Sequence, residues 1–236
     1  MRRSISDPDG PAAGWASDAP RRHWTARLYD ATNLVVLLAQ LNLLLIVFTL
    51  LGGVVLGLAP ALVAAATCIR SARRNELHRP FQTFARTWSA QFFSANAALL
   101  PLVLAIGLLG WGYISFSLSG EGASVQRIVS LVAFAVATVM LVWATAMMAH
   151  YDLPRGRVIP LALRFSLLNL IPSVLQLFLI VALVYATGWF YALPLLIGLG
   201  AWAYASVTFS LLCFARNDQL VATATETTPD SLHRTR

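Results

Sequence analysis

The sequence predicts an all-α protein, a polytopic bundle of transmembrane helices. Three observations predict this class: long apolar runs, few charges, and arginines confined almost entirely to the segments between the runs. Hydrophobic residues form 58% of the 236-residue chain and charged residues only 11%, whereas soluble domains carry roughly 25% charged residues. With a mean hydropathy of +0.70, the chain is expected to use lipid as the solvent of its helices.

Six apolar runs are expected to form six spans, because a helix needs about 20 residues to cross about 30 Å of hydrocarbon. The polar residues 1–27 and 217–236 lack periodicity, so we expect a disordered leader and a disordered tail around a membrane domain of residues 28–216. The runs lie at about 31–51, 54–69, 92–114, 128–149, 167–186 and 190–214.

Residues 31–69 leave three alternatives open: one long bent helix, a re-entrant segment, or two spans that meet at Gly52–Gly53. All 17 basic residues are arginine, and six crossings place 16 of them on one side, with only Arg127 on the other. Arginine is retained in the cytoplasm during insertion. The arginines therefore favour two spans here, three helical hairpins in total, and both termini in the cytoplasm of a bacterial cell.

The second run carries a stripe of small residues. Gly53, Gly57, Ala61 and Ala65 recur every four residues, a spacing that lets a neighbouring helix backbone approach closely. Pro60 lies within this run and is expected to kink the helix. We expect the stripe to be a helix-packing surface, although small residues at this spacing also arise by chance in an alanine-rich segment.

An amphipathic segment precedes the third run. Phe81, Phe84 and Trp88 are spaced three and four residues apart, on the face opposite Arg79 and Arg86. A short helix over residues 80–91 is therefore expected to lie in the cytoplasmic interface, with its aromatic face on lipid or on a partner and its arginines near anionic head groups. The alternative is a simple anchor helix.

The apolar runs contain no Asp, Glu, Lys or Arg, which removes the usual carriers of proton and ion coupling. Their main polar residues are Asn42, Asn96, Asn169 and Gln176. These side chains are expected to form hydrogen bonds between helices, and a substrate path is the alternative. A small-solute facilitator would bring them together in one cavity.

Chemistry is not indicated elsewhere in the chain. The four histidines lack metal-ligand spacing, and no nucleotide-binding or hydrolase motif occurs. His150 beside Tyr151 and Asp152 is a conceivable proton relay, but a loop histidine next to one carboxylate is common without function. Cys68 and Cys213 indicate neither a disulfide framework nor a zinc site. We therefore expect no enzyme, no cofactor and no metal, and the scattered arginines argue against nucleic acid as a partner.

The stretch from Gly52 to Asn96, with its small-residue helix, polar turn and Phe-x-x-Phe helix, resembles the YesL-like family of uncharacterised bacterial membrane proteins. The resemblance implies no activity, only an association with sugar ABC transporter components. It favours a non-catalytic accessory or scaffold protein. A small-solute facilitator and a membrane enzyme are the alternatives, and the oligomeric state stays open.

Overall fold

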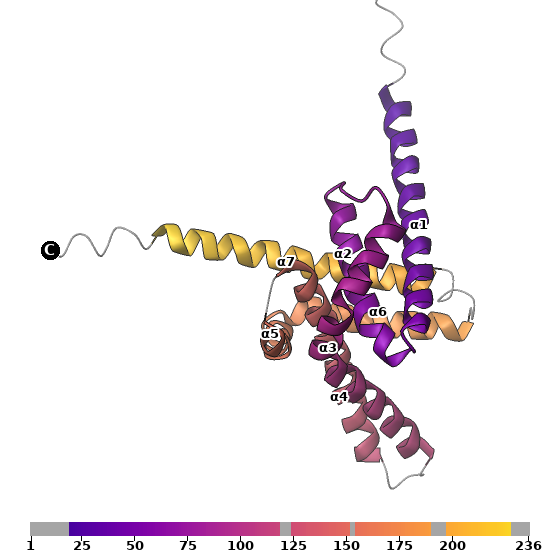
Figure 1. Ribbon diagram of the computed structural model, residues 1–236, viewed down its shortest axis with the longest axis vertical. Coiled ribbons are helices and arrows are strands. Elements are labelled where there is room, and N and C mark those ends of the chain that lie inside the picture. Colours follow the sequence, from indigo (N-terminus) through magenta and orange to yellow (C-terminus); the bar gives the residue numbers. More distant parts are fainter. Residues whose placement is uncertain (1–18, 119–123, 152–153, 190–196, 228–236) are drawn as a thin grey trace, which may run out of the picture. The chain divides into compact units, whose positions relative to one another are not determined.

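The computed structural model describes residues 19–118, 124–151, 154–189 and 197–227. Every element within these ranges is helical, which confirms the all-α class (Figure 1). The elements are α1 (Ala19–Leu51), α2 (Val55–Arg73), α3 (Pro80–Leu118), α4 (Ser124–His150), α5 (Arg155–Leu168), α6 (Leu170–Trp189) and α7 (Leu199–Thr227).

The chain divides into two units, residues 1–37 and residues 38–236, with the boundary inside α1. In the first unit, α1 begins at Ala19, so residues 19–27 are helical rather than disordered as expected. Pro20 suits the first turn of a helix, and neither glycine nor proline interrupts residues 21–51. Residues 1–18 of the expected leader lie outside the described residues.

The second unit contains everything from Leu38 onward, beginning with a reversal of the chain between α1 and α2. Gly53 has a φ of 78°, a conformation that glycine adopts at little cost. The amide of Val54 donates to the Thr49 carbonyl over 2.9 Å and closes the turn. Residues 31–69 therefore form two helices joined by a tight turn, and the alternative of one long bent helix is wrong.

α3 is longer than expected. The expected interfacial helix of residues 80–91 and the expected span of residues 92–114 are one continuous helix of 39 residues, about 58 Å long at about 1.5 Å per residue. Pro80 occupies the first turn, and the sequence has no glycine or proline between it and Pro101. The separate interfacial helix was wrong because nothing in this stretch stops a helix.

The expected span of residues 167–186 is broken in the structure. α5 and α6 meet at Asn169 with a bend of 98°. Pro172, in the first turn of α6, has no amide hydrogen for the Leu168 carbonyl, and its ring crowds the same carbonyl. By contrast, α4 closely matches the expected span of residues 128–149.

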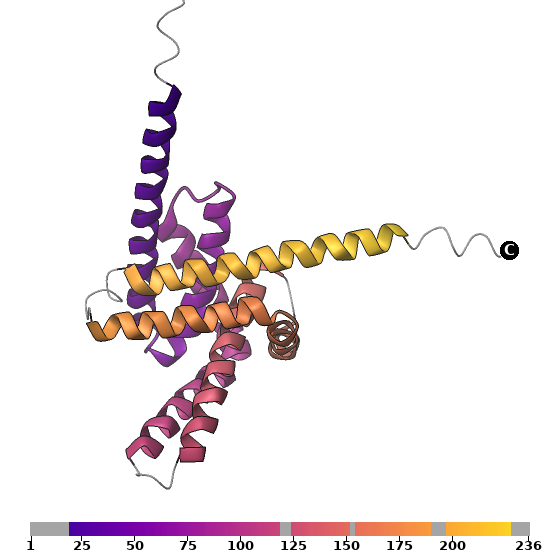
Figure 2. The same ribbon diagram turned by 180° about the vertical axis from the view of Figure 1, so that it is seen from behind.

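α7 continues to Thr227, so residues 217–227 of the expected disordered tail are helical. No proline or glycine occurs between residues 201 and 227, so nothing in the sequence ends the helix where the apolar segment ends. Residues 190–196 of the sixth expected span and residues 228–236 of the tail lie outside the described residues. α6 and α7 lie side by side in both views (Figures 1 and 2).

Four helices in the described part of the chain are long and apolar enough to cross a membrane: Ala31–Leu51, Val55–Arg73, Pro80–Leu118 and Ser124–His150. The bent pair Gly156–Leu168 and Leu170–Ala186 makes a fifth if it counts as one span. α7 does not meet this description. The structure thus contains four or five candidate spans where the sequence predicted six.

α2 lies at the centre of the second unit and packs against α3, α4 and α7. Small side chains make this central position possible, because six of its ten buried residues are alanine or glycine. The apolar core continues onto α3, α4 and α5, where the largest buried side chain is Trp143.

Candidate functional site

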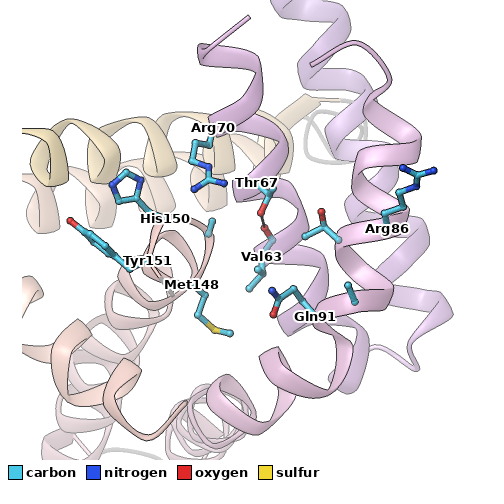
Figure 3. A pocket seen from close by; sticks show the side chains of 11 residues that line it. Val63, Thr67, Arg70, Arg86, Gln91, Met148, His150 and Tyr151 are labelled. Carbon is cyan, nitrogen blue, oxygen red and sulfur yellow. Dashed lines mark hydrogen bonds between the residues drawn. The ribbon is translucent and has the colours of Figure 1, made fainter. Parts of the chain in front are cut away.

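A polar pocket of about 450 Å³ opens where α4 ends between α2 and α3 (Figure 3). α3 and α4 are antiparallel, and Gly112 of α3 lies against Ser130 of α4. His150, the last residue of α4, follows Ser130 by about as many residues as Phe92 precedes Gly112, so His150 and Phe92 lie at about the same height. From Phe92, α3 extends for about three more turns to its first residue, Pro80. The pocket occupies the step that this difference in length leaves.

Three helices and the residue that follows α4 line the pocket. α2 and α3 contribute a mixture of hydroxyl, amide and guanidinium groups, and the end of α4 contributes two aromatic rings and a thioether. The lining residues are Val63, Thr67 and Arg70 of α2, Arg86, Thr87, Ala90 and Gln91 of α3, Met148, Ala149 and His150 of α4, and Tyr151.

Within the part of the chain that the structure describes, the lining is positively charged and contains no carboxylate. Arg70 is partly buried in the last turn of α2. It makes no hydrogen bond or ion pair with any residue that the structure describes. In Figure 3 its guanidinium lies between Thr67 and His150, whereas the exposed Arg86 points away from them. Arg70 is thus the cation of the pocket, and Arg86 stands at its rim.

One side of the pocket is fixed by α7. The Tyr151 hydroxyl donates a hydrogen bond of 2.9 Å to Asp218, and His150 Nε2 lies 3.7 Å from the same carboxylate. The His150 ring also stacks on Phe214, with ring centroids 5.5 Å apart. Burial, and then the hydrogen bond to Asp218 and the charge of its carboxylate, raise the pKa of the Tyr151 phenol to about 12. This wall is therefore neutral at Tyr151, and contacts between the end of α4 and α7 hold it in place.

The structure gives His150, the conceivable but not expected proton relay, a different carboxylate neighbour. This neighbour is Asp218, 68 residues away in the sequence, while Asp152 lies outside the described residues. His150 Nδ1 is buried and has no hydrogen-bond partner among the residues that the structure describes. Among the described residues, no group of three histidine, cysteine or acidic side chains is arranged to hold a metal ion.

The aromatic face expected at the interface packs mainly inside the protein. Phe84 is 0% exposed and its ring lies 5.1 Å from that of Phe48 on α1, while the Trp88 ring lies 5.3 Å from Phe48. Only Phe81 is largely exposed, at 63%. The expectation that all three aromatic residues contact lipid or a partner is therefore wrong for Phe84, because α1 covers that face.

The stripe of small residues divides into two parts. Gly57, Ala61 and Ala65 are buried in α2, and a Cβ atom at Gly57 would overlap the backbone carbonyl oxygens of Phe48 and Thr49. Gly53 is exposed in the turn, with no neighbouring atom where its Cβ would be, so it does not pack between helices. The close approach of α1 and α2 thus depends on Gly57.

The polar side chains of the apolar runs lie at separate helix contacts. Asn42 Oδ1 accepts a hydrogen bond from the Gly200 amide on α7, and Asn96 Nδ2 donates to the Leu56 carbonyl of α2 over 2.9 Å. Gln176 Nε2 donates to Ser210 Oγ of α7 over 3.2 Å. Asn169 instead sits at the α5–α6 bend, where Nδ2 donates to the Phe165 carbonyl. These four residues do not converge on one cavity.

No motif in the sequence marks the residues of the polar pocket as a set. Thr67 and Arg70 are three residues apart on α2, and Thr87 and Gln91 are four apart on α3, so each pair shares a helix face. These spacings were the available signal. The pocket itself depends on where α4 ends relative to α3, and this relative position cannot be predicted from either segment of the sequence alone.

These features define the class: an all-helical protein whose several long apolar helices indicate a membrane-embedded protein, with a polar pocket at the arginine-rich helix ends. The sequence model "Protein of unknown function, DUF624" matches residues 38–113. A curated relative, "Uncharacterized protein YesV" of Bacillus subtilis (strain 168), is 33% identical over 144 residues, which cover 60% of this chain and 69% of the relative. The chain belongs to the DUF624 family.

The resemblance seen in the sequence is thus confirmed at the level of an uncharacterised family. The matched residues 38–113 contain the α1–α2 turn, the whole of α2 and most of α3, including the Phe48 and Phe84 rings. No solved structure matches the chain.

Proposed function

We propose that the protein is a non-catalytic accessory or scaffold component of the bacterial cytoplasmic membrane, associated with ABC-type carbohydrate uptake. The observation that carries this proposal is the use of Asn42, Asn96 and Gln176 in three separate helix contacts. Such hydrogen bonds hold helices together with modest strength. A small-solute facilitator, the alternative function, would need polar side chains gathered along one path.

The partner surface that we propose is an apolar face of α6. Val174, Phe178, Val181 and Tyr185 are all exposed, and their spacing of four, three and four residues places them on one side of the helix. Contiguous exposed apolar surface is typical of protein or membrane contacts. Phe178 is 65% exposed, so it can contribute much area to a helix of a transporter subunit.

The partner test is copurification from the native membrane with the membrane-spanning and ATP-binding subunits of a sugar transporter. We expect both subunits to copurify with the wild-type protein, and to be lost when Val174, Phe178 and Val181 are changed together to alanine. The matched control is Leu108→Ala on α3, which is also exposed. Sugar uptake in a deletion strain is the second measurement. Normal uptake together with no recovery of transporter subunits would contradict the proposal.

We also propose six crossings, as three helical hairpins, with α6 and α7 as the fifth and sixth spans and both termini in the cytoplasm. The arginine distribution supports this topology, because it leaves only Arg127 on the outer side. Reporter fusions after Gly53 and after Arg236 test it. An exported reporter at Gly53 and a cytoplasmic one at Arg236 are expected, and the reverse at either position would refute the topology.

A further inference from the structure

We propose that the polar pocket between α2, α3 and the end of α4 binds a small anion that carries a phosphate group, with Arg70 as the anchor. This inference does not depend on the scaffold role or on any transporter partner. It rests on the charge, the unpaired donors and the size of the pocket.

The charge of the lining points to an anion. Among the described residues that line the pocket, Arg70 and Arg86 are charged and none is an aspartate or glutamate. Asp218, a described carboxylate that contacts the pocket wall, is already engaged by Tyr151 and His150. The positive charge of Arg70 is therefore left for a ligand.

The unpaired donors point to phosphate. A guanidinium offers two parallel donors that match two phosphate oxygens, and such charge-assisted bonds are among the strongest in proteins. The amide of Gln91 and the hydroxyl of Thr87 line the same pocket and make no hydrogen bond to a described residue. A phosphate group has a third oxygen to accept from these groups, whereas a carboxylate would have to share with them the two oxygens that the guanidinium already binds.

The size and place of the pocket allow two sources for this group. A volume of about 450 Å³ falls within the range of roughly 300–1,000 Å³ that is usual for small-molecule sites. It accommodates a soluble phosphate ester or the head group of an anionic phospholipid. Arg70 lies in the last turn of α2, at the arginine-rich end of the helix, which is the level at which anionic head groups collect.

The experiment uses the full chain in lipid nanodiscs. One arm adds glycerol phosphate to discs of phosphatidylcholine and measures binding by calorimetry. The second arm replaces part of the phosphatidylcholine with phosphatidylglycerol and measures retained lipid by native mass spectrometry. Citrate serves as a carboxylate comparison. Binding of glycerol phosphate supports a soluble ester, and selective retention of phosphatidylglycerol supports a head group.

The variants test the anchor. Arg70→Gln should weaken binding about tenfold or more, because it removes charge-assisted hydrogen bonds, and Arg70→Lys should fall between it and the wild type. Arg73→Gln is the matched control, since Arg73 is in the same last turn of α2 but exposed and outside the pocket. Gln91→Leu provides a second variant that keeps Arg70 and should weaken binding to a smaller extent.

Three outcomes would overturn the proposal: no binding of either phosphate probe, binding of citrate alone, or equal loss in Arg70→Gln and Arg73→Gln. The last result would show general attraction to a basic surface. Thermal unfolding without ligand, measured for every variant, shows that each comparison is made between folded proteins.

Discussion

α2 and α6 are both apolar helices of the second unit, yet they are packed in opposite ways. α2 presents glycine and alanine to its neighbours and is buried on most of its surface. α6 carries branched and aromatic side chains that remain exposed, and its buried positions include Ser173 and Gln176. An apolar side chain gains little by leaving lipid for protein, because both surroundings are apolar. Which helices pack closely therefore depends on how small their side chains are.

The difference also separates two ways of holding a helix. α2 is held by close backbone contact, as at Gly57 against Phe48 and Thr49. α6 is held by a few hydrogen bonds: Trp143 Nε1 donates to Ser173 Oγ over 3.2 Å, and Gln176 donates to Ser210. We therefore expect substitutions in α2 and its neighbours to be costly and those in α6 to be mild.

The largest effect is expected for Gly57→Leu. The added side chain would overlap the α1 backbone, so α1 and α2 would have to separate. Overpacking a core site usually lowers the free energy of unfolding by roughly 1 to 3 kcal/mol. We expect a larger loss here, because the side chain meets backbone that cannot move aside. Folded protein in detergent should fall sharply in fluorescence-detected size-exclusion chromatography. The control is Gly107→Leu, where no atom lies near the added Cβ. Equal yields of the two variants would contradict the α1–α2 contact.

Phe84→Ala should be the next most damaging change. The side chain is fully buried against Phe48, and removal of such a ring costs about 3–5 kcal/mol. Phe81→Ala, three residues earlier on the same helix, should cost far less because its side chain is mostly exposed. Thermal unfolding of both variants in one detergent gives the comparison. If Phe81→Ala were the more damaging change, the aromatic face would be arranged differently from the structure.

Gln176→Leu should have a small effect on stability. The substitution removes the hydrogen bond to Ser210, and interhelical bonds of this kind contribute about 0.6 kcal/mol on average in membrane proteins. Gln176 Oε1 has no hydrogen-bond partner in the described part of the chain, so an apolar replacement also removes an unsatisfied group. The same variant bears on the facilitator alternative: a marked change in solute flux through proteoliposomes, with stability unaltered, would favour that function.

The smallest effect is expected for Phe178→Ala on the exposed face of α6. Exposed positions away from special features usually change stability by no more than about 0.5 kcal/mol. The melting temperature in detergent should be unchanged, while recovery of the transporter subunits should fall. A large loss of stability would show that α6 is packed on this face, and the contrast with α2 would disappear.

The sequence predicts the helical class and several helix limits well, because apolar runs end where polar turns begin, as at Leu51 and near His150. It predicts less well where a helix continues through a change of character. The aromatic start of α3 and its apolar remainder differ in composition but contain no helix breaker between them. Hydropathy therefore indicated two elements where the backbone has one.

The remaining differences arise from contacts that are distant in the sequence. Phe84 was expected at an interface because its own segment is amphipathic, and only the position of Phe48 on α1 buries it. The pocket around Arg70 likewise depends on the register of α3 with both α2 and α4. Pro172 was a local signal for the α5–α6 bend, since a proline near the start of a span marks a helix end.

The length of α3 has a mechanical consequence. A continuous helix of 39 residues is about 58 Å long. The hydrocarbon layer is about 30 Å thick, so a helix tilted by about 40°, the upper end of the usual range, has about 39 Å of its length inside the layer. About a dozen residues must therefore project from the layer as a stiff rod. The turns from Pro80 to Gln91 form one wall of the pocket and pack against Phe48 of α1 through Phe84. A change in the tilt of α3 in the bilayer would therefore move this wall of the pocket and the end of α1 together.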